Sequence, residues 1–155
     1  MASPAIAFDL GQALTARVAS AAASLGLEAH FVAEVQPSAN PKFGDFQANG
    51  ALAYAKRQQQ NPRALADQLV AALAAQTEGP ACTIEVAGPG FLNFTLAPDA
   101  MLSWLNTYTG EADFRAGAGA IKAGRTVVVD YPSPNTAKQM HIGHLRPMVI
   151  GEAVA

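Results

Sequence analysis

Hydrophobic residues recur at three- and four-residue spacing in four stretches of the chain, which is the period of a helix with one apolar face. Each stretch is bounded by glycine, proline or a capping side chain; Asp45 is the expected cap of the second, and Asn61 of the third. The pattern predicts helices over residues 6–25, 45–57, 61–78 and 98–109. The apolar side of the fourth comprises Met101, Leu102, Trp104 and Leu105.

Shorter segments alternate between apolar and polar residues, as half-buried strands do. The pattern predicts strands over residues 31–35, 83–87 and 91–96, and the Gly88-Pro89-Gly90 turn makes the last two an antiparallel hairpin. From residue 110 to 124 the periodicity is lost and glycine and alanine accumulate, which is typical of a linker. The fold class expected for the part before the linker is α+β.

Composition places the chain among globular proteins, because half of its 155 residues are hydrophobic and only 14% are charged. No apolar run reaches the ~20 residues that cross a bilayer, and no basic residue precedes the weak apolar start, so we expect a cytoplasmic protein without a membrane partner. A net charge of -2 confines any RNA contact to a local patch. The single cysteine, Cys82, is expected to be a buried structural thiol.

Candidate chemistry lies close to the C-terminus of the chain. Residues 127–130 predict a strand, a loop with two prolines follows, and His141-Ile142-Gly143-His144 opens an apolar helical pattern. The amides of a helix start favour phosphate, Gly143 leaves the backbone accessible, and two histidines three residues apart lie on one face, beside Lys138. Two histidines at this spacing are also common as capping or core residues. A metal site needs more ligands than the two imidazoles, so none is predicted.

The C-terminal segment resembles the signature region of class I aminoacyl-tRNA synthetases, and of arginyl-tRNA synthetases in particular. The class signature is His141-Ile142-Gly143-His144. Two flanking segments resemble the arginine enzymes within this class: the following Leu145-Arg146 and the preceding Asp130-Tyr131-Pro132-Ser133-Pro134-Asn135-Thr136-Ala137-Lys138, which Gln139-Met140 joins to the signature. Residues 42–49 and 86–93 are similar to two segments of that family's added N-terminal domain. Pro147 departs from the pattern, because the family more often has serine there.

The resemblance implies an arginine-tRNA ligase that uses ATP and Mg²⁺ to join L-arginine to tRNA(Arg) through an arginyl-adenylate. It implies that His141, Gly143 and His144 bind ATP, and that both histidines and Lys138 act in catalysis. Ser133 and Asn135 match positions that hold the α-amino and carboxylate groups of arginine. Serine and asparagine are also ordinary turn residues, and Lys138 could be a solvated loop lysine.

The added domain implies a tRNA contact, for which residues 42–49 supply a cation, aromatic rings and amides. The candidates are Lys42, Phe43, Phe46, Gln47 and Asn49. Aromatic side chains stack on unpaired bases and amides bind base edges. The alternative is that both phenylalanines belong to the core and that Asp45 is only a helix cap. Lys56, Arg57 and Arg63 could bind phosphates nearby or form a solvated helix face.

The predicted organisation is an added tRNA-binding domain (residues 1–112), a linker (113–124) and the start of a Rossmann-type α/β catalytic domain (125–155). We expect an N-terminal fragment that ends just after the signature, inactive by itself, from an enzyme that is monomeric at full length. The alternative is a stand-alone tRNA-binding module without catalysis. A small nucleotidyltransferase shares the histidine tetrad but normally places it near its N-terminus.

Overall fold

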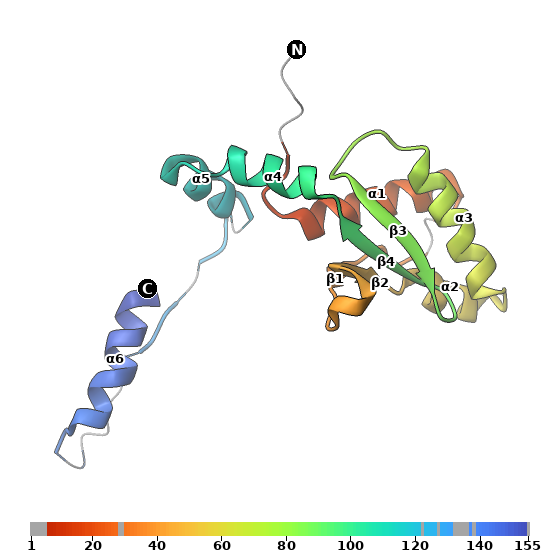
Figure 1. Ribbon diagram of the computed structural model, residues 1–155. Coiled ribbons are helices and arrows are strands. Elements are labelled where there is room, and N and C mark those ends of the chain that lie inside the picture. The colour runs from red at the N-terminus through yellow and green to blue at the C-terminus, as the bar shows by residue number, and fades with distance from the viewer. Residues whose placement is uncertain are drawn as a thin grey trace. The chain divides into compact units, whose positions relative to one another are not determined.

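A computed structural model describes residues 6–27, 30–121, 123–126, 128–131, 137 and 139–154. The chain divides into two compact units, Met1–Ile121 and Lys122–Ala155. Figure 1 shows their secondary structure, and each unit is described by itself. An α+β unit is followed by a helix that carries the histidine tetrad at its start, which confirms the predicted fold class.

The N-terminal unit is built on a four-stranded antiparallel sheet. Its strands are β1 (Val35–Pro37), β2 (Phe46–Ala48), β3 (Cys82–Ala87) and β4 (Phe91–Leu96), in the spatial order β1-β2-β4-β3. The predicted hairpin is confirmed, because β3 and β4 pair in register from Cys82 opposite Leu96 to Ala87 opposite Phe91. Two β4 residues two positions apart, Leu92 and Phe94, are both buried, which gives the sheet one apolar face.

Three helices bury that apolar face of the sheet: α1 (Leu10–Ser24), α2 (Gly50–Gln58) and α3 (Pro62–Ala74). Their caps explain where two of them begin, because the Asp9 carboxylate accepts from the Gln12 amide at 2.8 Å and the Asn61 side chain accepts from the Arg63 amide at 3.0 Å. The Asn61 cap is thus confirmed. The largest fully buried side chains come from α1, α3 and β4: Phe94, Leu14, Leu69, Leu73, Leu92 and Val18.

The prediction that Asp45 caps a helix is wrong. Residues 46–48 form strand β2, and α2 begins only at Gly50. The Asp45 amide donates to the Phe94 carbonyl, and its carboxylate accepts from the Leu96 amide, both at 2.8 Å. Asp45 therefore ties the start of β2 to β4, and the gain from pairing β2 with a buried strand outweighs the local capping preference.

The first predicted strand is displaced along the chain. The structure places β1 at Val35–Pro37, where the sequence predicted residues 31–35. Its partner β2 has only three residues, and pairing begins where Val35 faces Ala48. The available partner, rather than the alternation of residue types, therefore fixes the position of this strand.

Helix α4 (Pro98–Thr107) confirms the fourth predicted helix, but most of its apolar side is not covered. Met101, Leu102 and Leu105 are each more than half exposed, and only Trp104 is half-buried. Helix α5 (Glu111–Ile121) occupies most of the segment predicted as an irregular linker. Alanine favours helix strongly enough to offset the glycines, and the Glu111–Arg115 ion pair lies one turn apart.

The segment ahead of α1 is tied to α4 and α5. The Trp104 indole donates to the Phe8 carbonyl at 2.8 Å, and the Tyr108 hydroxyl donates to the Ile6 carbonyl at 2.7 Å. The centroid of the Phe8 ring lies 4.9–5.4 Å from the ring centroids of Trp104, Tyr108 and Phe114. A Cβ added at Gly117 would lie 2.3 Å from that ring, so α5 needs a residue without a side chain there.

The C-terminal unit contains helix α6 (Ile142–Val154), as predicted, with Pro147 in its interior. Residues 128–130 of the predicted strand are not in a strand, and Val127 lies outside the described residues. A strand is defined by hydrogen bonds to a neighbouring strand, and the described part of this unit offers none. Among the described helices, none has the length and apolarity that a membrane crossing requires.

Candidate functional site

The histidine tetrad forms a compact turn at the start of α6. The His144 amide donates to the His141 carbonyl at 2.9 Å, and the two imidazole rings lie 4.0 Å apart between centroids. A Cβ at Gly143 would lie 2.9 Å from Cε1 of His141, so the glycine makes room for that ring. The structure thus brings together the three tetrad residues for which an ATP contact is predicted.

Main-chain amides contact one nitrogen of each imidazole. The His141 amide donates to Nδ1 of His144 at 3.0 Å, and the Gly143 amide donates to Nδ1 of His141 at 3.2 Å. Nδ1 of His144 also lies 3.2 Å from the His141 carbonyl, but the shorter contact to an N–H donor makes it an acceptor. With both Nδ1 atoms accepting, the neutral rings carry their protons on Nε2. No hydrogen bond within the described part of the chain engages either Nε2, so both can donate to a ligand.

Several predicted site residues lie outside the described residues: Ser133, Pro134, Asn135, Thr136 and Lys138. Of the signature region, Ala137 and residues 139–144 are described. Within the described part of the chain, no three His, Cys, Asp or Glu side chains gather to hold a metal ion.

Tyr131 contacts the far end of the same helix. Its hydroxyl donates to the Glu152 carboxylate, a partner that no sequence pattern indicated because 21 residues separate the two. This hydrogen bond, with a smaller contribution from burial, raises the pKa of Tyr131 above its ordinary value of 10.0. The neutral phenol is the donor, so the contact persists below pH 10 and is lost as pH rises through the raised pKa.

We therefore expect the Glu152 contact to delay the ionisation of Tyr131 when tyrosinate absorbance is followed with rising pH. Glu152→Gln should move that transition back towards pH 10, and Tyr131→Phe should remove it. Glu111→Gln, which changes another exposed carboxylate, is the control. Identical titrations of the wild type and Glu152→Gln would contradict the contact.

The predicted RNA-contacting residues separate into two groups. Lys42 and Phe43 lie in the short helix η1 (Pro41–Phe43), where Phe43 is 48% exposed, and Asn49 is exposed at the start of α2. Phe46 is half-buried against the core, and the Gln47 amide donates to the Asn93 side chain at 2.8 Å. The alternative that both rings are core residues is therefore wrong for Phe43 and partly right for Phe46.

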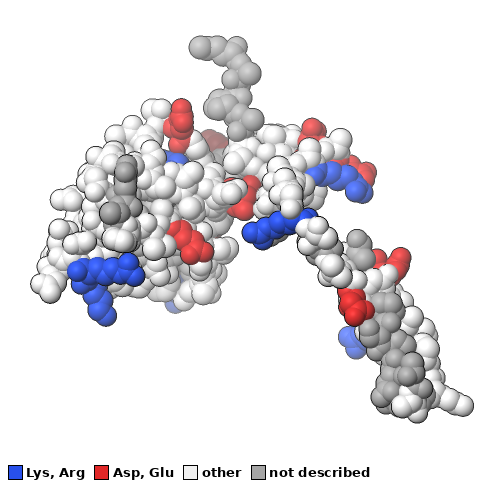
Figure 2. All heavy atoms as spheres, turned by 180° about the vertical axis from the view of Figure 1, so that it is seen from behind, with Lys and Arg blue, Asp and Glu red and all other residues white. Residues whose placement is uncertain are grey.

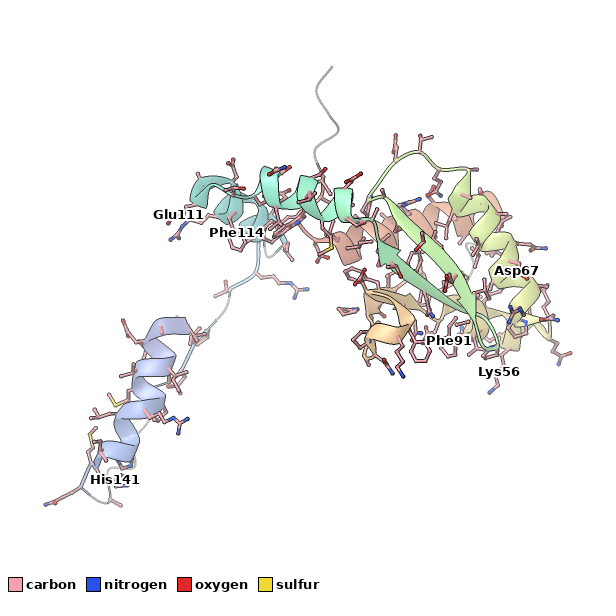
Figure 3. All side chains as sticks on the ribbon, viewed as in Figure 1. Lys56, Asp67, Phe91, Glu111, Phe114 and His141 are labelled. Carbon is pink, nitrogen blue, oxygen red and sulfur yellow. The ribbon has the colours of Figure 1, made fainter. Side chains whose placement is uncertain are left out.

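Basic side chains gather at one end of the N-terminal unit, where α2 ends and α3 begins. Lys56 and Arg57 lie in the last turn of α2, and Arg63 in the first turn of α3 donates to the Gly88 carbonyl in the β3–β4 turn at 3.2 Å. Figure 3 shows Lys56 and Phe91 at this end, and Figure 2 shows a mostly uncharged surface with few basic groups. Exposed cations at this end are suited to phosphate contacts.

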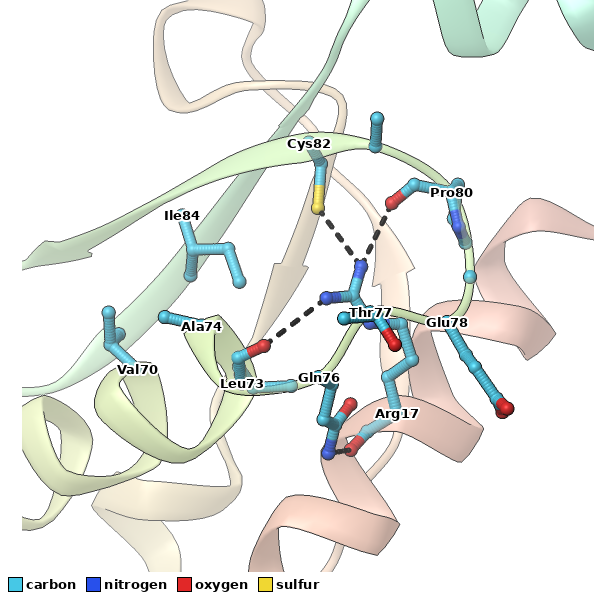
Figure 4. A pocket seen from close by; sticks show the side chains of 12 residues that line it. Arg17, Val70, Leu73, Ala74, Gln76, Thr77, Glu78, Pro80, Cys82 and Ile84 are labelled. Atoms are coloured by element: carbon cyan, nitrogen blue, oxygen red, sulfur yellow. Dashed lines mark hydrogen bonds between the residues drawn. The ribbon is translucent and has the colours of Figure 1, made fainter.

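A cavity of about 420 Å³ lies between α1, α3 and the loop that leads to β3. Figure 4 shows the Arg17 guanidinium in it, donating to the Pro80 carbonyl at 2.9 Å and to the Leu73 carbonyl in the last turn of α3 at 3.4 Å. Arg17 thus caps α3. Burial raises the pKa of the Cys82 thiol, and the nearby Arg17 opposes this only in part. A protonated, half-buried thiol fits the predicted structural role.

Two family models match consecutive parts of the chain. The model described as "Arginyl tRNA synthetase N terminal domain" matches residues 11–96, which is more than half of the chain. The model described as "tRNA synthetases class I (R), catalytic domain" matches residues 113–155. The second match begins within α5, the helix that occupies the predicted linker.

Curated relatives agree with these matches. The arginine-tRNA ligase of Laribacter hongkongensis is 48% identical over 121 residues, which cover 78% of this chain and 20% of the relative. The arginine-tRNA ligase of Chromobacterium violaceum is 44% identical over 144 residues, which cover 93% of this chain and 24% of the relative. The chain thus spans about a fifth to a quarter of the length of these relatives.

The fold is found in a solved structure as well. The crystal structure of arginyl-tRNA synthetase from Plasmodium falciparum matches 97% of this chain and 28% of that one, with a TM-score of 0.67 and 24% identity. This likeness concerns the fold alone, whereas the matched family models carry the assignment. The chain belongs to the arginyl-tRNA synthetase family.

Proposed function

We propose that this chain is part of an arginine-tRNA ligase, which activates L-arginine with ATP and transfers it to tRNA(Arg). The observation that carries the proposal is the order of two matches along one chain, the N-terminal domain first and the catalytic domain, with its histidine tetrad, second. The named relatives are arginine-tRNA ligases over the same residues.

In the activation step, an oxygen of the arginine carboxylate attacks the α-phosphorus of ATP, and pyrophosphate leaves. Negative charge on the phosphate oxygens is stabilised by donors already in place. The Nε2–H groups of His141 and His144 would supply two donors, and Gly143 would let the nucleotide approach the helix start. Ser133 and Asn135 would hold the α-amino and carboxylate groups of arginine, with Lys138 as an added cation.

Magnesium would accompany the triphosphate and neutralise part of its charge. Mg²⁺ commonly keeps several waters and binds through phosphate oxygens with few protein ligands. The histidine donors at the helix start are suited to the phosphates that such an ion would accompany.

The N-terminal unit would bind tRNA(Arg) through η1 and its surroundings. Phe43 is exposed enough to stack on an unpaired base, Lys42 beside it can meet a phosphate, and Asn49 is exposed nearby in the sequence. Phe46 and Gln47 would support this surface from β2 rather than form its outermost part. Lys56, Arg57 and Arg63 would add phosphate contacts that carry no sequence information.

Phe43→Ala should weaken binding of tRNA(Arg) to the 155-residue chain by about 1–3 kcal/mol, the usual contribution of one base stacked on an aromatic ring. The measurement is fluorescence anisotropy of a labelled tRNA(Arg) transcript. Phe114→Ala is the matched control, because Phe114 is 47% exposed against 48% for Phe43. Equal affinities of the two variants would contradict a stacking role for Phe43.

Exchange of labelled pyrophosphate into ATP tests the catalytic part of the proposal. The complete product of the gene that encodes this chain should show exchange that depends on arginine, with tRNA(Arg) present, and that lysine does not support. Binding of tRNA(Arg) without any exchange would instead identify a stand-alone tRNA-binding module.

A further inference from the structure

Helix α4 has a continuous apolar side, and one edge of that side is covered by the N-terminal unit. Successive residues lie about 100° apart around a helix axis, so Ala100, Trp104 and Tyr108 follow one another along this edge. Ala100 is buried, and the Trp104 and Tyr108 side chains donate to carbonyls of the segment ahead of α1. This edge therefore fixes α4 to the unit in which it lies.

The other edge of the same apolar side is uncovered. It consists of Met101, Leu102 and Leu105, which we call the α4 face, and each of these side chains is more than half exposed. Single exposed apolar residues are common, but three large ones at adjoining positions of one short helix form a patch typical of an interaction surface. The polar residues of the helix lie on its remaining side: Asp99, Ser103, Asn106 and Thr107.

An apolar hollow of about 400 Å³ has Trp104 in its wall. Its other large lining side chains are apolar as well: Phe8, Leu10, Phe46 and Ile121. The one charged lining residue among those described, Asp9, uses its carboxylate to cap α1. Because the hollow offers little to a polar group, it is suited to an apolar side chain. Helix α4 thus contributes both to this hollow and to the α4 face.

The two family matches indicate what covers the α4 face. The N-terminal model ends at residue 96, before α4, and the catalytic model begins at residue 113, within α5. Nevertheless, α5 belongs to the N-terminal unit, where Phe114 packs on Phe8 with 5.1 Å between ring centroids (Figure 1). The first element matched by the catalytic model is therefore already packed on the unit that carries the α4 face.

Length and charge narrow the occupant further. The chain spans about a fifth to a quarter of the curated relatives, so under the proposed function most of the enzyme follows residue 155. RNA is a poor cover, because α4 contains no lysine or arginine. The single cation of α5, Arg115, is paired with Glu111 at 2.9 Å. A protein surface that is itself apolar fits the α4 face better.

We propose that the N-terminal unit docks through the α4 face onto the part of the complete gene product that follows residue 155. The inference rests on the proposed function, because it takes the longer enzyme as its frame. The partner surface would place aliphatic or aromatic side chains against Met101, Leu102 and Leu105. An apolar contact of this kind restricts the motion of one domain relative to another. It would therefore hold the tRNA-binding unit in a defined position on the enzyme.

Thiol labelling of the complete gene product tests the contact. Leu102→Cys and Leu105→Cys place a thiol in the α4 face, and Ser103→Cys, the matched control, places one on the other, also exposed side of the same helix. The thiols at positions 102 and 105 should react with maleimide roughly tenfold or more slowly than that at position 103, because reaction requires the interface to open. In the 155-residue chain, all three should react at similar rates. Mass spectrometry of the peptide with residues 98–110 measures the labelling.

Equal labelling of the three variants in the complete gene product would overturn the docking proposal. Slow labelling at positions 102 and 105 of the 155-residue chain that is relieved by dilution would identify a second copy as the occupant. Slow labelling that requires added tRNA(Arg) would identify RNA, and either result overturns the proposal. Pyrophosphate exchange is measured on the same samples. Normal exchange with equal labelling would refute the docking alone, whereas absence of exchange by the wild type would refute the proposed function whatever the labelling.

Hydrogen exchange supplies a second measurement that needs no substitution. The amides of α4 should exchange roughly tenfold or more slowly in the complete gene product than in the 155-residue chain, because opening of the helix then also breaks the docked contact. Helix α2, which carries no part of the α4 face, is the reference and should exchange alike in both. Equal exchange of α4 in the two proteins would contradict the docking.

Discussion

Phe94→Ala is expected to lower the free energy of unfolding of the N-terminal unit by about 3–5 kcal/mol, the range found when a buried phenylalanine is truncated in a core. Phe94 is fully buried in β4, with Phe46 opposite it on β2 and Ile84 opposite it on β3. The cavity left by its ring would be bordered by both neighbouring strands and the helices above them. Urea unfolding followed by far-ultraviolet circular dichroism measures the loss.

Phe43→Ala makes the matched control for this experiment, because the same residue type is truncated at a site that is 48% exposed. Its expected effect on unfolding is below about 0.5 kcal/mol, as for most surface substitutions. Because Phe43 is assigned to RNA binding and Phe94 to the core, Phe43→Ala should weaken tRNA binding with little effect on unfolding. Phe94→Ala should instead lower the free energy of unfolding. A loss below about 1 kcal/mol in Phe94→Ala would contradict the core described above.

His141→Ala and His144→Ala are each expected to lower the rate of arginine-dependent pyrophosphate exchange by about 10²–10³-fold, the usual effect of removing one positioned donor from a developing anion. His141→Gln should retain more activity than His141→Asn. The glutamine amide nitrogen can reach the place of Nε2, whereas the asparagine amide nitrogen reaches only that of Nδ1, which the Gly143 amide already occupies.

His30→Ala is the control, because it removes the third histidine of the chain from an exposed position in the N-terminal unit. It should leave exchange unchanged. The thermal unfolding of the His141 and His144 variants should stay close to that of the wild type, since neither side chain is buried. An exchange rate within tenfold of the wild-type rate in either His141→Ala or His144→Ala would contradict the role assigned to these histidines.

Local signals in the sequence predicted most of the helices, because the caps and breakers act within a few residues. Asn61 followed by proline marks the start of α3, and Gly88-Pro89-Gly90 marks the β3–β4 turn, without any distant partner. Asp45 failed as a cap for the opposite reason. The hydrogen bonds of its amide and its carboxylate go to β4, about fifty residues further on, and no local pattern carries that information.

Glycine and alanine misled the prediction for residues 113–124. Their abundance resembles that of a flexible linker, but alanine is also the best helix former. The helix is also packed, because the absence of a side chain at Gly117 leaves room for the Phe8 ring.

For the candidate site, the histidine tetrad could be predicted because its residues are contiguous in the sequence. The contact of Tyr131 with Gly151 and Glu152 could not, since it depends on how the segment lies along the helix.

Residues 6–8, ahead of α1, form an N-terminal strap that is held to α4 by Trp104 and Tyr108. This contact determines which part of the chain the fluorescence of its single tryptophan reports. Trp104 donates to the Phe8 carbonyl and packs on its ring, and it does not belong to the core cluster that contains Phe94, Leu69 and Leu14. Intrinsic fluorescence therefore follows detachment of the N-terminal strap, whereas circular dichroism follows the helices as a whole. If the strap is released first, the two spectroscopic transitions separate, and their distance along the denaturant axis measures how independently this segment melts.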